Sequence, residues 1–151
     1  MIVNVSGSFP EHHDLVSSFC HFVADEIMSH GHSELEVDIE FENDLFSESG
    51  VLGDCVSVFD DYFKDFTIRL DRHQDEDELL MTVAHEMVHV KQYATGELYQ
   101  YSGLRGYRYK NDVYPQDYSY VLRPWETEAR IMEEVLVNKW FKELDSLCEY
   151  Q

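Results

Sequence analysis

The sequence at residues 82–90 is Thr82-Val83-Ala84-His85-Glu86-Met87-Val88-His89-Val90, which contains the pattern His-Glu-x-x-His. On a helix, two histidines four residues apart lie on one face, one turn apart, so both imidazoles can reach one ion. Zn²⁺ accepts neutral imidazole nitrogens, and a catalytic zinc site takes three protein ligands and leaves one position for water. Glu86 borders the same face, where it can take a proton from that water. The stretch therefore supplies two candidate ligands, His85 and His89, and a candidate catalytic base, Glu86.

The residues around this pattern predict a helix that is buried on most of its sides. At about 100° per residue, the apolar positions fill a wide arc and the polar positions form one stripe. The apolar arc contains Leu79, Leu80, Met81, Val83, Ala84, Met87, Val88, Val90 and Ala94. The polar stripe contains Glu78, Thr82, His85, Glu86, His89, Gln92 and Tyr93. This division favours a helix whose polar stripe faces a cleft. It is less typical of a surface helix with solvated histidines.

Length and composition indicate a single folded domain over residues 1–151. Hydrophobic residues make up 44% of the chain and aromatic residues 14%, which is typical of a globular protein. The formal net charge is −20, from 31 acidic and 11 basic residues. Such a charge disfavours binding to a phosphate backbone, so we expect no nucleic-acid partner and favour a basic one.

The cysteines and the N-terminal residues indicate an intracellular chain. Cys20, Cys55 and Cys148 are scattered and form no Cys-x-x-Cys pair, which is typical of reduced, buried thiols. Residues 1–8 have no basic segment and too short an apolar run for a signal peptide. No stretch approaches the length of a membrane span. We therefore expect a cytoplasmic protein that does not bind membranes.

The rest of the pattern predicts an α+β fold. A short strand at residues 2–5 precedes a helix over about residues 11–29, and alternating residues predict strands at 35–41, 55–59 and 66–70. Three strands in succession favour a small, three-stranded, mainly antiparallel sheet. Residues 43–54 are expected to form a loop, Asp75 or Asp77 caps the His-Glu-x-x-His helix, and a last helix runs from Pro124 to about Leu147. His30-Gly31-His32 is predicted to be an exposed turn rather than a metal site.

Residues 97–120 are predicted to form a long loop that is unusually rich in tyrosine. Loops of this length in a compact domain are commonly functional or mobile. This one follows the His-Glu-x-x-His helix, so it could fold over the site. Most of its tyrosines are expected to pack as ordinary amphipathic rings, and one could donate its hydroxyl to a developing oxyanion. The sequence does not indicate which one.

Two histidines leave a catalytic zinc one protein ligand short. No histidine follows His89 in the chain, so a third histidine downstream is excluded. The nearest plausible carboxylates are Glu126 and Glu128, on the helix that is expected to pack against the His-Glu-x-x-His helix. At this point both remain candidates.

The segments His85-Glu86-Met87-Val88-His89-Val90-Lys91-Gln92-Tyr93 and Pro124-Trp125-Glu126-Thr127-Glu128-Ala129 resemble small phage-type metallopeptidases. These are minimal gluzincin-like zinc proteases, related in layout to SprT-like and ImmA/IrrE-like domains. The shared layout covers most of the chain: a leading helix, a small sheet, the His-Glu-x-x-His helix and a glutamate-bearing helix. The resemblance implies a zincin-like minimal metalloprotease domain, located in the host cytoplasm if the chain is phage-encoded.

The resemblance also implies roles for particular residues. In such families the glutamate ligand often stands three residues before an alanine, which favours Glu126 and leaves Glu128 as the alternative. Many gluzincins carry an aspartate four residues after the ligand, which orients a histidine. This chain has Arg130 or Met132 there, so the residue that orients the histidine stays unassigned.

We therefore expect zinc-dependent hydrolysis of peptide bonds, with zinc on His85, His89 and Glu126, and with Glu86 as general base. The substrate is a protein or peptide, and the segment Phe66–Leu70 is the natural edge strand to hold it by β-addition. A regulated protease that cuts one partner is a variant of this hypothesis. An acidic binding or decoy protein, such as a DNA mimic or a trap for a basic partner, with structural zinc or none, is the alternative from another class.

Overall fold

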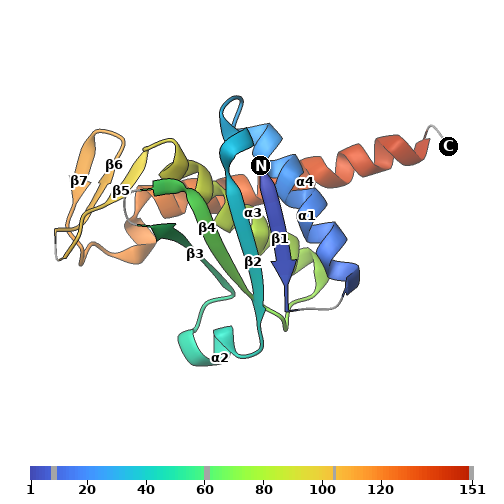
Figure 1. The fold of residues 1–151 in the computed structure, drawn as a ribbon, viewed down its shortest axis with the longest axis horizontal. Coiled ribbons are helices and arrows are strands. Elements are labelled where there is room, and N and C mark those ends of the chain that lie inside the picture. Colours follow the sequence, from blue (N-terminus) through green and yellow to red (C-terminus); the bar gives the residue numbers. More distant parts are fainter. Residues whose placement is uncertain (8–9, 60–61, 104, 150–151) are drawn as a thin grey trace.

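The computed structural model describes residues 1–7, 10–59, 62–103 and 105–149. Its helices and strands follow one another along the chain as shown in Figure 1. The helices are α1 (Pro10–Ile27), α2 (Leu45–Ser49), α3 (Glu76–Ala94) and α4 (Pro124–Glu149), with 3₁₀ turns η1 (His32–Glu34) and η2 (Tyr120–Leu122). The strands are β1 (Ile2–Ser6), β2 (Glu36–Glu42), β3 (Gly53–Phe59), β4 (Tyr62–Asp71), β5 (Leu98–Gln100), β6 (Tyr107–Tyr109) and β7 (Asp112–Tyr114).

The main sheet has four strands in the order β1-β2-β4-β3. Strands β1 and β2 are parallel, as are β2 and β4, and only the β3–β4 pair is antiparallel. The expectation of a three-stranded, mainly antiparallel sheet is therefore wrong. Because β1 and β2 are joined through helix α1, they can pair in parallel, and β2 pairs with β4 rather than with its neighbour in sequence, β3. The expected α+β class holds.

One face of the sheet carries the core. Figure 1 shows α1 and α3 on this face, with the long helix α4 beside them. Val37 and Ile39 of β2 and Ile68 of β4 are fully buried, as the alternating pattern of these strands predicts. Gly53 lets the edge strand approach α3 closely, since a Cβ atom there would lie 2.6 Å from the Thr82 Cγ2 atom. The edge of the sheet is thereby held against the helix that carries His85 and His89.

The segments expected to be loops contain short elements. Residues 43–54 include helix α2, and residues 97–120 include β5, β6 and β7, which form a separate antiparallel sheet, and turn η2. Each of these strands has three residues, too few for alternation to identify them. Leu98, Tyr109 and Trp125 form a second small core under this sheet. The tyrosine-rich segment is therefore packed against the start of α4.

The helix predicted at about residues 11–29 is α1 (Pro10–Ile27) in the structure. The helix predicted from Pro124 to about Leu147 is α4 (Pro124–Glu149). Among the helices in the described part of the chain, none combines the length and the apolarity that crossing a membrane requires.

Candidate metal centre

Helix α3, which carries His85 and His89, begins at a capping box. The Asp75 Oδ1 atom accepts a hydrogen bond from the backbone N–H of Glu78 (2.8 Å), and the Glu78 carboxylate accepts one from the N–H of Asp75 (3.3 Å). These bonds satisfy two backbone donors that no helix can pair internally. Of the two predicted caps, the structure uses Asp75. With the start of α3 fixed, His85 and His89 face helix α4.

Helix α4 brings Glu126 to the two histidines. The His85 Nε2 atom lies 3.1 Å from Glu126 Oε2, the His89 Nε2 atom lies 3.3 Å from Glu126 Oε1, and the two Nε2 atoms lie 3.2 Å apart. His89 and Glu126 are buried and His85 is half-buried. The three side chains form a group that could hold a metal ion.

Glu128, the alternative ligand, lies outside this group. Its carboxylate accepts hydrogen bonds from the Tyr109 hydroxyl (2.7 Å) and the Gln92 side-chain amide (3.3 Å), and it pairs with Lys91 (3.5 Å). Two residues along a helix rotate the side chain by about 200°, which explains why Glu126 and Glu128 point to different neighbours.

A hydrogen-bonded chain fixes the ring of His89. The Gln92 amide nitrogen donates to the Trp125 carbonyl oxygen (3.0 Å) and to Glu128, both of which can only accept. The Gln92 Oε1 atom must therefore face His89, whose Nδ1 lies 2.8 Å away and must be the donor. In a neutral ring, a proton on Nδ1 leaves the lone pair on Nε2. That is the atom that points at His85 and Glu126, as metal binding requires.

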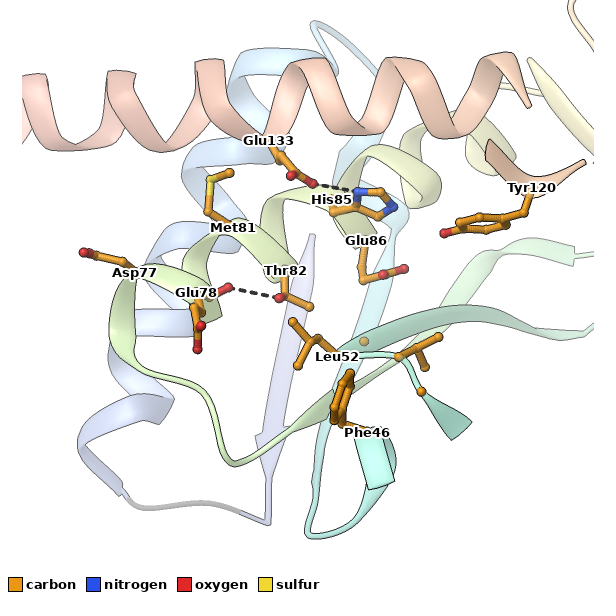
Figure 2. Close-up of a pocket in the computed structure, with 13 residues that line it drawn as sticks. Phe46, Leu52, Asp77, Glu78, Met81, Thr82, His85, Glu86, Tyr120 and Glu133 are labelled. Atoms are coloured by element: carbon orange, nitrogen blue, oxygen red, sulfur yellow. Dashed lines mark hydrogen bonds and ion pairs between the residues drawn. The ribbon is translucent and has the colours of Figure 1, made fainter. Parts of the chain in front are cut away.

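Glu133 holds the ring of His85 in the same way. Its Oε2 atom lies 2.7 Å from His85 Nδ1, and Figure 2 shows this contact beside the site. Glu133 follows Glu126 by two helical turns, so both carboxylates lie on the face of α4 that meets α3. The orienting residue expected at Arg130 or Met132 is thus found at Glu133, three residues beyond Arg130 and next to Met132.

Burial and hydrogen bonding have opposite effects on the pKa values of this group. Burial alone would lower the pKa of His85, but hydrogen bonds with Glu126 and Glu133 raise it to about 10. Burial alone would raise the pKa of Glu126, but hydrogen bonds from the two histidines hold it below its ordinary value. The carboxylates of Glu126 and Glu133 therefore favour positive charge beside the two histidines.

Glu86 is 6% exposed and lines the same cleft. Burial raises the pKa of its carboxyl to about 7, against the opposing effect of His89 and His85. A carboxyl with a pKa near neutrality can both accept and return a proton, which is the property that a general base needs.

Tyr120 also belongs to the site. Its hydroxyl donates to Glu126 Oε2 (3.0 Å), and Figure 2 shows its ring pointing toward His85 and Glu86. Burial, together with the nearby Glu126, raises the pKa of this hydroxyl, so it stays a hydrogen-bond donor. Among the tyrosines of the segment 97–120, this one reaches the candidate ligands.

Two pockets meet at the group. The larger, about 630 Å³, lies toward α2, and the smaller, about 200 Å³, lies toward β6 and Trp125. The walls of both include His85, Glu86 and Tyr120. Of the candidate ligands, His85 borders both pockets, and His89 and Glu126 border the smaller one.

Sequence reasoning found His85, Glu86, His89 and Glu126 but missed Glu133, Gln92 and Tyr120. The seven-residue spacing of Glu126 and Glu133 was available as a signal, since it places both on one face of a helix. Gln92 stands in the polar stripe of α3 and was not assigned a role. His32, in the turn predicted to be exposed, pairs with Asp25 (3.1 Å), away from this group.

Comparison of the chain with protein-family models, with curated proteins and with solved structures found no match.

Proposed function

We propose that this chain is a zinc-dependent peptidase whose zinc ligands are His85, His89 and Glu126. The observation that carries the proposal is the convergence of these three side chains beside a buried carboxyl, Glu86, in an open cleft. A group that only stabilised the fold would need neither Glu86 nor access from two sides.

The geometry of the group fits zinc. Zinc with ligands at 2.0–2.1 Å in a tetrahedron separates neighbouring ligand atoms by about 3.3 Å. The two histidine Nε2 atoms lie 3.2 Å apart, and His85 and His89 lie 3.1 and 3.3 Å from different oxygens of Glu126. Both histidines also donate from Nδ1 to a fixed acceptor, which is the arrangement expected around a ligating imidazole. Two histidines with one carboxylate most often hold zinc when the reaction is hydrolysis.

The bound zinc would supply an acidified water and polarise the peptide carbonyl. In the hydrolysis, water adds across the peptide bond and the C–N bond breaks, giving a carboxylate and an amine. Glu86 takes a proton from the attacking water and passes it to the leaving nitrogen. Its burial and its place beside His85 and His89 support this role. Tyr120, whose hydroxyl donates to Glu126 in this structure, would exchange that bond for one to the carbonyl oxygen as negative charge develops there.

The edge strand β3 is the part of the sheet that could hold an extended peptide. The segment Phe66–Leu70, expected at the edge, lies in β4, which pairs with β2 on one side and β3 on the other. That expectation is wrong, because β3 occupies the edge position. Gly53, Asp54 and Cys55 of β3 form part of the pocket that contains His89 and Glu126. A peptide added along β3 would therefore lie beside the pocket that contains Glu86, His89 and Glu126.

The net charge of −20 supports the alternative proposal, an acidic binding or decoy protein. The two proposals differ in what they require of the cleft. The activity of a decoy would survive the loss of His85 and His89, whereas peptide hydrolysis would not. The peptidase proposal accounts for the buried Glu86, and the decoy proposal does not, so we prefer the former. A peptidase that cuts one basic partner would combine both features.

The substitution Glu86→Gln tests the proposal. The variant should retain zinc, because Glu86 is not a ligand, and should lose peptide hydrolysis by a factor of about 10² to 10⁴. The assay measures release of new amines from a mixture of unfolded proteins and peptides, with zinc content measured in parallel. Glu134→Gln, at an exposed position of α4, is the matched control and should keep full activity. Undiminished hydrolysis by Glu86→Gln would overturn the proposal.

A further inference from the structure

The larger of the two pockets beside the metal centre has a wall that is mainly apolar. It extends from His85, Glu86 and Tyr120 toward α2 and the start of α3. Figure 2 shows Phe46 and Leu52 on one side of this space, Met81 on the other, and Glu86 with Tyr120 at its inner end. A side chain that entered the pocket would therefore belong to a residue next to the reacting peptide bond.

Three large apolar side chains of this wall are exposed to solvent. Phe46 is 55% exposed, Val51 39% and Leu52 38%. Exposing large apolar side chains together is unfavourable in water, and clusters of this kind mark places where a ligand or partner is bound. Because three such residues line one pocket, an apolar group of a bound peptide would shield them from water.

Hydrogen bonds to buried residues hold this wall in place. The backbone N–H of Phe46 donates to the buried carboxylate of Asp71 (2.8 Å), whose own N–H donates to the Leu52 carbonyl oxygen (2.8 Å). The Gln74 amide donates to the same carbonyl (3.1 Å) and accepts from the Thr82 hydroxyl (2.6 Å). Through Gln74, the loop that carries Leu52 is tied to α3. The pocket is therefore formed before a ligand arrives, so little conformational entropy would be lost on binding.

The outer end of the pocket is acidic. Asp77 and Glu78, both exposed in the first turn of α3, belong to its lining, as does Glu133 nearer the metal centre. Among the described residues that line this pocket there is no lysine or arginine, and the one basic side chain, His85, lies at the metal centre. Carboxylates around an apolar pocket attract a cationic group that lies next to an apolar one.

We propose that this pocket, formed by Phe46, Leu52 and Met81 with Asp77 and Glu78 at its rim, selects the substrate. It takes a bulky apolar side chain, such as leucine, methionine or phenylalanine, from the residue next to the cleaved bond. The acidic rim favours lysine or arginine in the neighbouring positions of the same peptide. The proposal rests on the peptidase function proposed above and names the class of peptide that it cleaves.

Cleavage of a random peptide library by the zinc-loaded chain tests this proposal, with the products sequenced by mass spectrometry. We expect bulky apolar residues at one position beside the cleaved bond, preferred over alanine by about 10- to 100-fold in kcat/KM. Lysine or arginine should be enriched nearby. Leu52→Trp fills the pocket and should shift the preference to glycine and alanine, while a peptide with alanine at that position is still cleaved. Val113→Trp, at a position of β7 that is 65% exposed and outside the pocket, is the matched control.

A second pair of variants tests the rim. Asp77→Asn should reduce the enrichment of lysine and arginine by several-fold and leave the apolar preference in place. Asp145→Asn, at an exposed position near the end of α4, should change neither. Cleavage without an apolar preference, or a preference that Leu52→Trp leaves unaltered, would overturn the proposal.

Capture of peptides from the same library by the Glu86→Gln variant separates this proposal from the proposed function. Selective capture of apolar-basic peptides without cleavage by the native chain would support the pocket and refute the peptidase. Cleavage without selectivity would refute the pocket alone. If the chain neither captures nor cleaves any peptide, both proposals are wrong.

Discussion

Gln92 is fully buried, three residues beyond His89, and its side chain has no freedom to turn. Its amide nitrogen is bound to the Trp125 carbonyl and to Glu128, so its oxygen is held against His89. Glu128 is held in turn by the hydroxyl of Tyr109. The small sheet formed by β5, β6 and β7 thereby helps to orient the candidate ligand His89 through Tyr109, Glu128 and Gln92.

We predict that Gln92→Ala weakens zinc binding by about 10- to 100-fold, because the ring of His89 loses the acceptor that fixes its orientation. The dissociation constant is measured by competition with a chromophoric chelator. Gln100→Ala, at an exposed position of β5, is the control and should bind zinc as the native chain does. Equal zinc affinities for Gln92→Ala and the native protein would show that the hydrogen bonds of Gln92 do not position His89.

A second prediction at this scale concerns Cys20, which is fully buried in α1. Burial raises the pKa of its thiol above the ordinary value. Above a pH of about 8.5 the unfolded chain loses this proton while the folded chain keeps it, so stability is full below that pH and falls as pH rises. The contribution approaches about 1.4 kcal/mol per pH unit.

The variant Cys20→Ala should therefore lose less of its free energy of unfolding between pH 8.5 and 10 than the native chain does. Urea unfolding under reducing conditions measures this difference. Cys148→Ala, which removes an exposed thiol, serves as the control. Identical pH slopes for Cys20→Ala and the native chain would contradict the account.

At the scale of helices and strands, the capping box of α3 gives a direct prediction. Asp75→Ala removes the acceptor for the Glu78 N–H and should lower the free energy of unfolding by about 1 kcal/mol. For a chain of this size the melting temperature should fall by about 2–4 °C. Asp145→Ala, at an exposed position of α4, removes a carboxylate without removing a cap. A melting temperature that Asp75→Ala leaves unchanged would mean that tertiary packing alone fixes the start of α3.

Helices and strand segments could be predicted where the periodicity was strong. The alternation of Val37, Ile39 and Phe41 identified β2, and the apolar arc around His85 and His89 identified α3. Strand partners could not be predicted in this way, because pairing depends on segments far apart in the chain. Strands β2 and β4 pair in parallel although α2 and β3 lie between them in the sequence, and no local pattern reveals this pairing.

In the candidate site too, local features could be predicted from the sequence, and features that depend on packing between distant segments could not. The spacing of His85 and His89 is local, so one helix determines it. The choice between Glu126 and Glu128 depends on how α4 packs on α3, and the structure places Glu126 beside the histidines. Tyr120 reaches the site from η2, a turn whose position follows from the packing of the whole segment 97–120. Its role among several tyrosines could not be predicted from sequence.

At the scale of the whole molecule, the candidate metal centre joins parts of the chain that are distant in sequence, α3 and α4. An ion that binds the folded chain and not the unfolded one adds RT ln(1 + [L]/Kd) to the stability, about 4 kcal/mol at a thousandfold excess over Kd. Removal of zinc with a chelator should therefore lower the melting temperature by about 10 °C, measured by calorimetry. Glu86→Gln should show the same shift and His85→Ala little or none. Equal melting temperatures of the native protein with zinc and with chelator would contradict the proposed zinc site.

The central claim is that His85, His89 and Glu126 together hold one zinc ion. The most direct test is the metal content per chain, measured by mass spectrometry after gel filtration, for the native protein and three variants. The account predicts one zinc per chain for the native protein and for Glu128→Gln, and none for His85→Ala and Glu126→Gln. A native chain that contains no metal after zinc is offered, or a Glu126→Gln variant that retains its zinc, would contradict it.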